Sequence, residues 1–320
     1  MGFLLLVVSA LLGITLGTTS LSISEIVESF KNGFSTAGGK IFLYVRLPRT
    51  AASLICGSAL AVSGAVIQGV LANRLASPSI IGVNSGAGLA VTLCTALGIY
   101  GGLRLSLFAF LGAFTAVMAV SLLARRIGAS RGTLILLGVA VNSFLNALSD
   151  SVVTFIPEVG VMSNDFKVGE FSSVTYSRLL PAAVLISLSI IILFTLTNEL
   201  DVLTLGEDNA RSLGMNTSLM RTLFLLLAAV LAGCAVSLAG LLSFVGLIVP
   251  HAVRRVAGSK ASRLLPLSAI FGGAFVCLCD TGARTLFSPY EIPVGIIMAF
   301  LGAPFFVFIL IKGKGGHTLA

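Results

Sequence analysis

The sequence predicts an all-α protein that crosses a membrane about ten times. The chain has 320 residues, of which 57% are hydrophobic and only 10% are charged, whereas a soluble domain carries roughly 25% charged residues. Its mean hydropathy is +1.08. Apolar runs recur along nearly the whole chain, and most are long enough to cross about 30 Å of hydrocarbon as a helix. A transmembrane barrel would show alternating apolar and polar residues instead of continuous runs.

Charged and turn residues divide the chain into ten apolar runs. Nine runs could each span a bilayer, whereas the run 241–250 is only about 15 Å long as a helix. The runs are 2–21, 47–71, 80–99, 103–124, 133–156, 179–197, 222–239, 241–250, 264–287 and 292–311.

The distribution of Lys and Arg decides whether the run 241–250 crosses separately. With ten crossings and the N-terminus inside, 12 of the 20 Lys and Arg residues are cytoplasmic, which leaves 8 outside. Fusing 222–250 into one helix leaves 7 inside and 13 outside. Because cytoplasmic loops carry an excess of Lys and Arg, the sequence predicts ten crossings, a break near Ala239–Gly240 and two cytoplasmic termini.

Two predicted loops are too long to be simple turns. The external stretch 22–43 has apolar residues at helical spacing opposite charged ones, which predicts an amphipathic helix at the membrane interface. The internal stretch 198–221 is the most polar segment on the cytoplasmic side. No soluble domain is predicted, so residues 1–320 form a single transmembrane domain.

The motifs of several function classes are absent from the sequence. There is no G-x-x-x-x-G-K-[ST] loop to hold ATP phosphates, and no nucleophile–base pair or His/Cys/acid cluster points to a catalytic or metal site. We therefore expect no catalytic residue, metal or cofactor in this chain. The net charge of +8 is better explained by loop topology than by nucleic-acid binding. The five cysteines all lie in apolar runs, which favours buried, unreactive packing.

Polar residues within the predicted spans are candidates for a transport path. Asn142, Asn146 and Asp150 share one face of the fifth span, although interhelical hydrogen bonding would explain such a row equally well. No acid lies near mid-membrane, which disfavours an ion-coupled secondary transporter. The full set of path candidates is Gln68, Asn73, Asn84, Ser85, Asn142, Asn146 and Asp150.

Small and charged residues suggest further contacts. Gly57, Ala61, Gly64 and Ala65 in the second span predict close helix packing. Asp280 could pair with Arg284 one turn away. Arg46 and Arg49 precede the second span on the predicted external side, against the positive-inside tendency. They could bind carboxylates of an external protein, or they could reach lipid phosphates.

Five long blocks of the sequence are informative when taken together: "VRLPRTAASLICGSALAVSGAVIQGVLANRLASPSIIGVNSGAG", "LGEDNARSLGMN", "AGLLSFVGLIVPHAVRR", "LPLSAIFGGAFVCLCDTGAR" and "EIPVGIIMAFLGAPFF". These blocks resemble the FecCD-type permeases, which are membrane subunits of ABC importers for iron–siderophore complexes, haem and cobalamin. The departure is Arg74, where the family usually has proline, in the cytoplasmic turn after the second span.

The resemblance implies a type II ABC importer permease fold of ten helices in the bacterial cytoplasmic (inner) membrane. It implies a second permease subunit, forming a homodimer, two separate ATPase subunits that use the ATP, and an external substrate-binding protein. The cargo would be a bulky metal chelate, with an iron–siderophore first and haem or cobalamin as alternatives. A secondary transporter is a weaker alternative because it leaves the polar stretch 198–221 unexplained.

The resemblance also assigns roles to individual residues. The stretch 198–221 matches the segment that couples the permease to its ATPase, and Arg46, Arg49 and Arg284 match positions that dock the binding protein. The fifth span would line the path. The matching coupling residues are Gly206, Glu207, Ala210, Arg211, Leu213 and Gly214.

Overall fold

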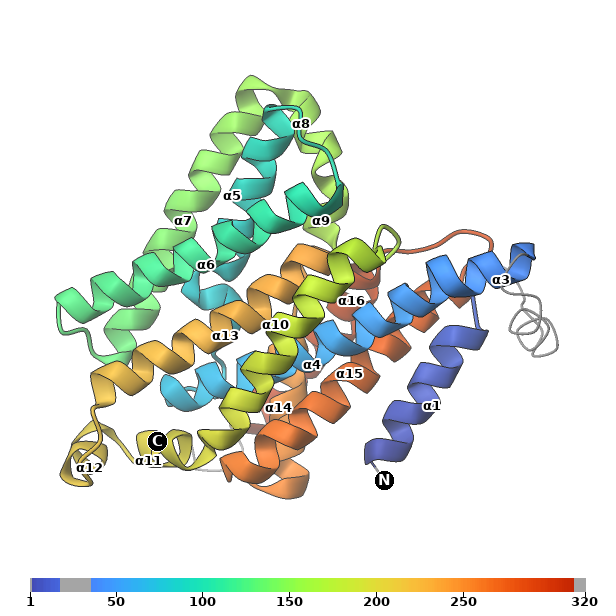
Figure 1. Cartoon of the computed structure of the whole chain (residues 1–320). Coiled ribbons are helices and arrows are strands. Elements are labelled where there is room, and N and C mark those ends of the chain that lie inside the picture. Colours follow the sequence, from blue (N-terminus) through green and yellow to red (C-terminus); the bar gives the residue numbers. More distant parts are fainter. Residues whose placement is uncertain (1, 18–35, 314–320) are drawn as a thin grey trace.

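The structure is a computed structural model that describes residues 2–17 and 36–313, and all regular structure in these ranges is helical (Figure 1). Residues 22–35, which make up most of the predicted amphipathic segment, lie outside the described ranges. The helices are α1 (Gly2–Thr15), α3 (Ala37–Ile41), the π-helix η1 (Phe42–Arg46), α4 (Leu47–Val70), the 3₁₀-helix η2 (Pro78–Ile81), α5 (Val83–Ala96), α6 (Gly102–Arg126), α7 (Arg131–Phe155), α8 (Pro157–Met162), α9 (Asn164–Val168), α10 (Tyr176–Thr195), α11 (Thr197–Thr204), α12 (Glu207–Ser212), α13 (Thr217–Ala239), α14 (Val245–Ala257), α15 (Ala261–Thr285) and α16 (Val294–Gly313).

Each of the ten predicted apolar runs contains a helix, which confirms the all-α membrane fold. Within the described residues, six helices are long and apolar enough to cross a membrane: the continuous Ala37–Val70 helix, α6, α7, α10, α13 and α15. Three shorter apolar helices are α1, α5 and the stretch Val294–Phe308 of α16. The tenth is α14, with 13 residues. The predicted break is confirmed, since α13 ends at Ala239 and α14 begins at Val245.

Helix α4 is the central helix of the bundle, packed against α13, α14 and α15. Its glycines lie against backbone atoms of neighbouring helices. A Cβ at Gly57 would lie 2.2 Å from the Gly272 carbonyl oxygen, and one at Gly64 only 1.9 Å from that of Gly246. Helices in lipid gain little from burying apolar side chains, so small residues that permit backbone contact drive their packing. The predicted close packing of this span is confirmed.

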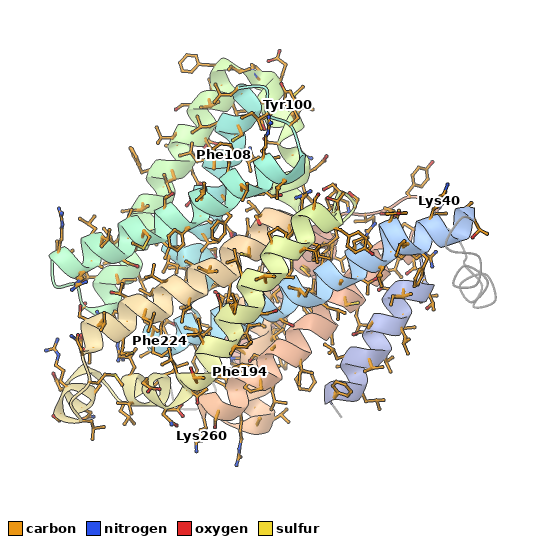
Figure 2. All side chains as sticks on the ribbon, in the orientation of Figure 1. Lys40, Tyr100, Phe108, Phe194, Phe224 and Lys260 are labelled. Carbon is orange, nitrogen blue, oxygen red and sulfur yellow. The ribbon has the colours of Figure 1, made fainter. Side chains whose placement is uncertain are left out.

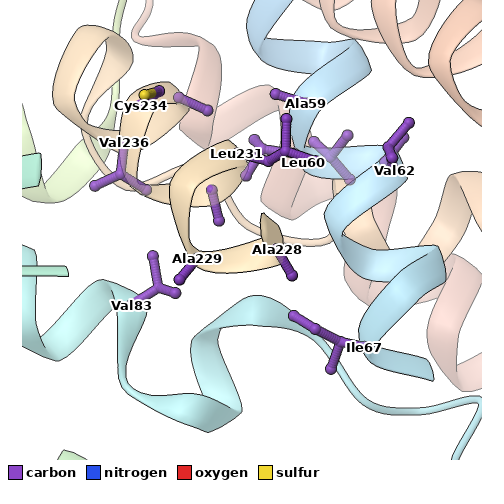
Figure 3. Close-up of a cluster of buried hydrophobic side chains, with 14 of the residues drawn as sticks. Ala59, Leu60, Val62, Ile67, Val83, Ala228, Ala229, Leu231, Cys234 and Val236 are labelled. Carbon is purple, nitrogen blue, oxygen red and sulfur yellow. The ribbon is translucent and has the colours of Figure 1, made fainter. Parts of the chain in front are cut away.

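Apolar side chains fill the space between α4 and α13, where Leu60 and Ile67 of α4 lie near Ala228 and Leu231 of α13 (Figure 3). The Ser63 hydroxyl donates to the Ala228 carbonyl over 2.8 Å, so one of the few polar groups here is satisfied across the interface. All five cysteines are free and buried. Their predicted packing role is therefore consistent with their position in the core.

The break between α13 and α14 is closed by backbone hydrogen bonds to the segment around α9. The Leu241 amide donates to the Phe166 carbonyl (2.9 Å), and the Glu170 amide donates to the Ala239 carbonyl (2.8 Å). The start of α16 joins them, because the Gly295 amide donates to the Gly169 carbonyl over 3.1 Å. Irregular backbone at membrane depth is stable only when its polar groups find partners within the protein. This junction therefore allows α14 to be a short, separate helix.

The close contact at Gly64 yields a stability prediction. Gly64→Ala would force α4 and α14 apart, and we expect a loss of about 3 kcal/mol, the upper end of the overpacking range. The matched control is Gly88→Ala in α5, where a Cβ would meet nothing within 4 Å. Thermal unfolding of the purified proteins in detergent would compare the two. Equal unfolding midpoints for the two variants would contradict the packing described for α4.

Candidate functional site

The start of α4 carries a buried cluster of charges drawn from distant parts of the sequence. Two nitrogens of the Arg49 guanidinium, Nε and Nη2, donate hydrogen bonds to Asp280 Oδ1 over 3.1 and 3.0 Å. Its Nη1 also donates to Glu291 Oε2 over 2.7 Å. On the other side of the same carboxylate, Arg284 Nε lies 3.2 Å from Asp280 Oδ2, which confirms the predicted pairing of these two residues.

The remaining donors of this cluster hold the end of α1. Arg46 Nη1 donates to the Ile14 carbonyl over 3.0 Å, and Arg284 Nη2 donates to the Gly13 carbonyl over 3.0 Å. These carbonyls belong to the last turn of α1, where helix oxygens lack intrahelical partners and favour cations. The cluster therefore joins the ends of α1, α4 and α15.

The structure places Arg46, Arg49 and Arg284, the residues predicted to dock a binding protein, inside the subunit. The three residues are only 3%, 6% and 3% exposed, and their guanidinium groups bind Asp280, Glu291 and backbone carbonyls of this chain. Both acidic partners of Arg49 lie far along the chain, at separations of 231 and 242 residues. In this structure the three arginines position the helix ends.

Two of the path candidates, Gln68 and Ser85, are buried inside the bundle. The Gln68 amide donates to the carbonyls of Ala76 (3.2 Å) and Gly246 (3.0 Å), and its oxygen accepts from Arg254. Because it joins the end of α4 to α14 and to the loop before η2, Gln68 supports the irregular backbone there. Ser85 is also buried.

Asn142 of α7 holds the 3₁₀-helix η2 in place. Its Nδ2 donates to the carbonyls of Ser79 (2.9 Å) and Ile80 (3.0 Å), and its Oδ1 accepts from the Ser85 hydroxyl. Asn73 acts locally, because its Oδ1 accepts from the Leu75 amide over 2.9 Å. For Asn142, Ser85 and Asn73, the described contacts are those of structural hydrogen bonding.

Asn146 and Asp150 lie on a largely exposed face of α7. Only 17% of the most apolar stretch of α7 is buried within this chain, compared with 78% for the Ala37–Val70 helix. Phe144 is 64% exposed on the same helix. Asn84, at the start of α5, is half-buried. The three polar residues predicted to share one face of α7 therefore differ in their surroundings. Asn142 faces η2, whereas Asn146 and Asp150 are available to a partner or a path.

The stretch 198–221 folds into α11 and α12, with glycines at both ends of α12. Gly206 and Gly214 have φ angles of +108° and +80°, a region that other residues rarely adopt. Ala210 is fully buried, and the amide of Met215 donates to its carbonyl over 3.0 Å. Arg211 is exposed and lies 3.5 Å from Glu207. The matched coupling residues therefore shape one compact turn of helix.

This stretch is tied to the beginning of α7 by two arginines that sequence reasoning missed. Arg221 Nη2 pairs with Glu207 Oε1 at 2.7 Å, and its Nη1 donates to the Ala129 carbonyl (3.1 Å) in the α6–α7 turn. Arg131, the first residue of α7, donates to the Leu203 carbonyl of α11 over 2.8 Å. A cation next to an apolar run is ordinarily a topology signal, so the sequence offered no pointer to these contacts.

The α11–α12 stretch also presents apolar side chains to its surroundings. Leu205 is 59% exposed and Leu213 is 66% exposed, on either side of α12. These leucines lie beside exposed polar residues such as Asp208 and Ser212. Apolar groups rimmed by polar residues are typical of a protein–protein contact.

The chain matches proteins of one transport family over nearly its whole length. Residues 5–312 match the family described as the FecCD transport family. The chain is 35% identical to the iron-uptake system permease protein FeuB of Bacillus subtilis, over 97% of this chain and 93% of that protein. It is also 35% identical to the hemin transport system permease protein HmuU of Yersinia pestis, over 98% and 96% of the two chains.

A solved structure has the same fold. It is described as an inward-facing conformation of a metal-chelate type ABC transporter, and it superimposes with a TM-score of 0.85 at 32% identity. The match covers 97% of each chain. The fold expected from the resemblance is therefore confirmed.

The buried charge cluster yields a second prediction. Asp280→Asn would leave Arg49 and Arg284 without their shared carboxylate in a site that is closed to water. We expect a loss of about 3–5 kcal/mol, which is the usual consequence of removing one partner of a buried ion pair. Glu291→Gln is the matched control, because the Glu291 side chain is 36% exposed and exposed pairs contribute about 0–1 kcal/mol.

Thermal unfolding in detergent and the yield of folded protein would measure both effects. Wild-type stability of Asp280→Asn would contradict the structural role assigned to this cluster.

Proposed function

Because the chain belongs to the FecCD transport family, we propose that it is the permease subunit of an ABC importer that moves a metal chelate across the bacterial cytoplasmic membrane. The observation that carries this proposal is the match of residues 5–312 to the family. The named relatives are an iron-uptake permease and a hemin permease. An iron–siderophore complex is the first candidate cargo, with haem or cobalamin as alternatives.

The energy would come from partner chains. The sequence lacks the glycine-rich loop that cradles ATP phosphates, so ATP hydrolysis is assigned to two separate ATPase subunits. The exposed Leu205 and Leu213 support the α11–α12 stretch as their docking site. This assignment puts α11, α12 and both termini in the cytoplasm, as the distribution of Lys and Arg predicts.

A second copy of the chain would pair through faces left uncovered in one subunit. The exposed face of α7, with Asn146 and Asp150, is the best candidate to line a path shared by the two subunits. Polar side chains exposed on a membrane helix are costly in lipid, so they favour a wet path or a protein contact. This uncovered face and the family support a homodimer.

An external binding protein would deliver the chelate at the opposite end, where α4 begins. Arg46, Arg49 and Arg284 act there by holding the ends of α1, α4 and α15 in one arrangement. The binding protein would then contact the surface that these helix ends support.

The test of the proposed function is uptake by the complete transporter. The permease, its ATPase and its binding protein would be reconstituted in vesicles, and accumulation of ⁵⁵Fe-siderophore and of hemin would be measured. We expect ATP-dependent accumulation of one cargo class that requires all three components. Accumulation driven by a proton or sodium gradient without ATP would contradict the proposal.

A further prediction concerns the link between α12 and α7. Arg221→Gln removes both the ion pair with Glu207 and the contact with Ala129, so nucleotide-driven movement of α12 would reach α7 less effectively. We expect uptake to fall about five- to thirtyfold, the effect of losing about 1–2 kcal/mol of coupling, while ATP hydrolysis continues.

Arg211→Gln is the matched control, because its side chain is 64% exposed and its contact with Glu207 is longer, at 3.5 Å. If both variants transported at the wild-type rate, the Arg221 contacts would have no part in coupling.

A further inference from the structure

A groove runs along the bundle between α1, α14 and α15, with a cavity of about 280 Å³. All of its lining side chains are apolar, so the groove offers nothing to bind a polar or charged chelate. The lining residues are Leu5, Ile248, Val249, Ala252, Val253, Val256, Ala257, Leu267, Phe271, Phe275 and Leu278.

The groove opens away from the core of the subunit. On α15 its lining residues Leu267, Phe271 and Phe275 form one stripe at helical spacing, whereas Gly272 and Gly273 point toward α4. On α14, Val256 lies at one end of the groove and is 89% exposed. Figure 1 shows α1, α14 and α15 on the same side of the bundle. Within the described residues, no other helix lines this groove.

Three cations stand at the end of the groove where α14 passes into α15. Arg255, Lys260 and Arg263 are all exposed, and no salt bridge joins them to an acid in the described part of the chain. Lys260 lies two turns before Leu267 on the groove stripe of α15, and it points away from the molecule (Figure 2). Asp201, an acid near this turn, accepts a hydrogen bond from the Ala261 amide through Oδ1 over 2.8 Å.

We propose that this groove binds an anionic phospholipid, with one acyl chain along α14 and α15 and the phosphate held by Arg255, Lys260 and Arg263. A chain of methylenes is complementary to the apolar walls, and clustered cations beside membrane helices attract anionic headgroups. Arginine and lysine bind phosphate through charge-assisted hydrogen bonds. Because the groove and the cations are contiguous, one molecule satisfies both.

The cations also fix the depth of the lipid. Asp201 links α11 to the start of α15, so the headgroup would lie at the same end of the bundle as the α11–α12 stretch. The lipid therefore belongs to the leaflet on that side, which the distribution of Lys and Arg predicts to be cytoplasmic.

The test measures lipid retention by the purified permease and does not depend on transport. Spin-labelled phosphatidylglycerol and phosphatidylcholine would be compared in vesicles that contain the protein, with the immobilised fraction read by electron paramagnetic resonance. We expect the wild type to immobilise phosphatidylglycerol several-fold more than phosphatidylcholine. The double variant Lys260→Gln/Arg263→Gln should lose this preference and keep its phosphatidylcholine signal.

A second variant and a matched control distinguish the contribution of the apolar groove from that of the cations. Ala252→Phe fills the groove and should reduce immobilisation of both lipids, with unfolding temperature measured to show that the fold is kept. The control Arg125→Gln/Arg126→Gln removes two exposed cations from the end of α6 and should retain the wild-type preference.

Equal immobilisation of the two lipids by the wild type would overturn the proposal, as would an unchanged preference in Lys260→Gln/Arg263→Gln. Cross-linking of Val256 to a second permease subunit in the vesicles would also overturn it, because protein and not lipid would then cover the groove.

Discussion

Close backbone contact along α4 sets the positions of the helices that surround it. Gly57 and Gly64 bring the carbonyls of Gly272 and Gly246 against this helix, so α15 and α14 are fixed relative to it. Since α14 is short and follows irregular backbone, it is stable only where its neighbours supply hydrogen bonds. Gln68 supplies them at one end of α4, through Ala76 and Gly246. The packing of α4 therefore decides where a broken span can exist.

Charged residues join the helix ends at both ends of this packed bundle through ion pairs and hydrogen bonds. At the start of α4, the Asp280 carboxylate pairs with both Arg49 and Arg284. Arg284 also donates a hydrogen bond to the Gly13 carbonyl at the end of α1. At the opposite end, Arg221 and Arg131 connect α11 and α12 to the beginning of α7. We propose that these contacts carry a displacement of α12 to α7 when a partner moves α12. In this proposal, the exposed face of α7 would move in response.

Much of the fold could be predicted from the sequence because it follows from local patterns. Apolar run length and the Lys/Arg distribution predicted ten helices and the break at Ala239–Gly240, and small residues predicted the packing of α4. The arginine roles could not be predicted in the same way. Arg49 pairs with Asp280 and Glu291, partners more than 200 residues away, and Asn142 binds η2 through backbone oxygens. Contacts of that kind depend on which helices become neighbours, and spacing along the chain does not determine it.

We propose that the α11–α12 stretch is the surface through which a partner ATPase drives this permease. The most direct test places a photo-cross-linking amino acid at Leu213 in the assembled transporter, with the same group at Tyr290, which is 79% exposed, as the control at the other end. We expect a cross-link from position 213 to the ATPase subunit and none from position 290. A cross-link from position 213 to the binding protein, or only to lipid, would contradict it.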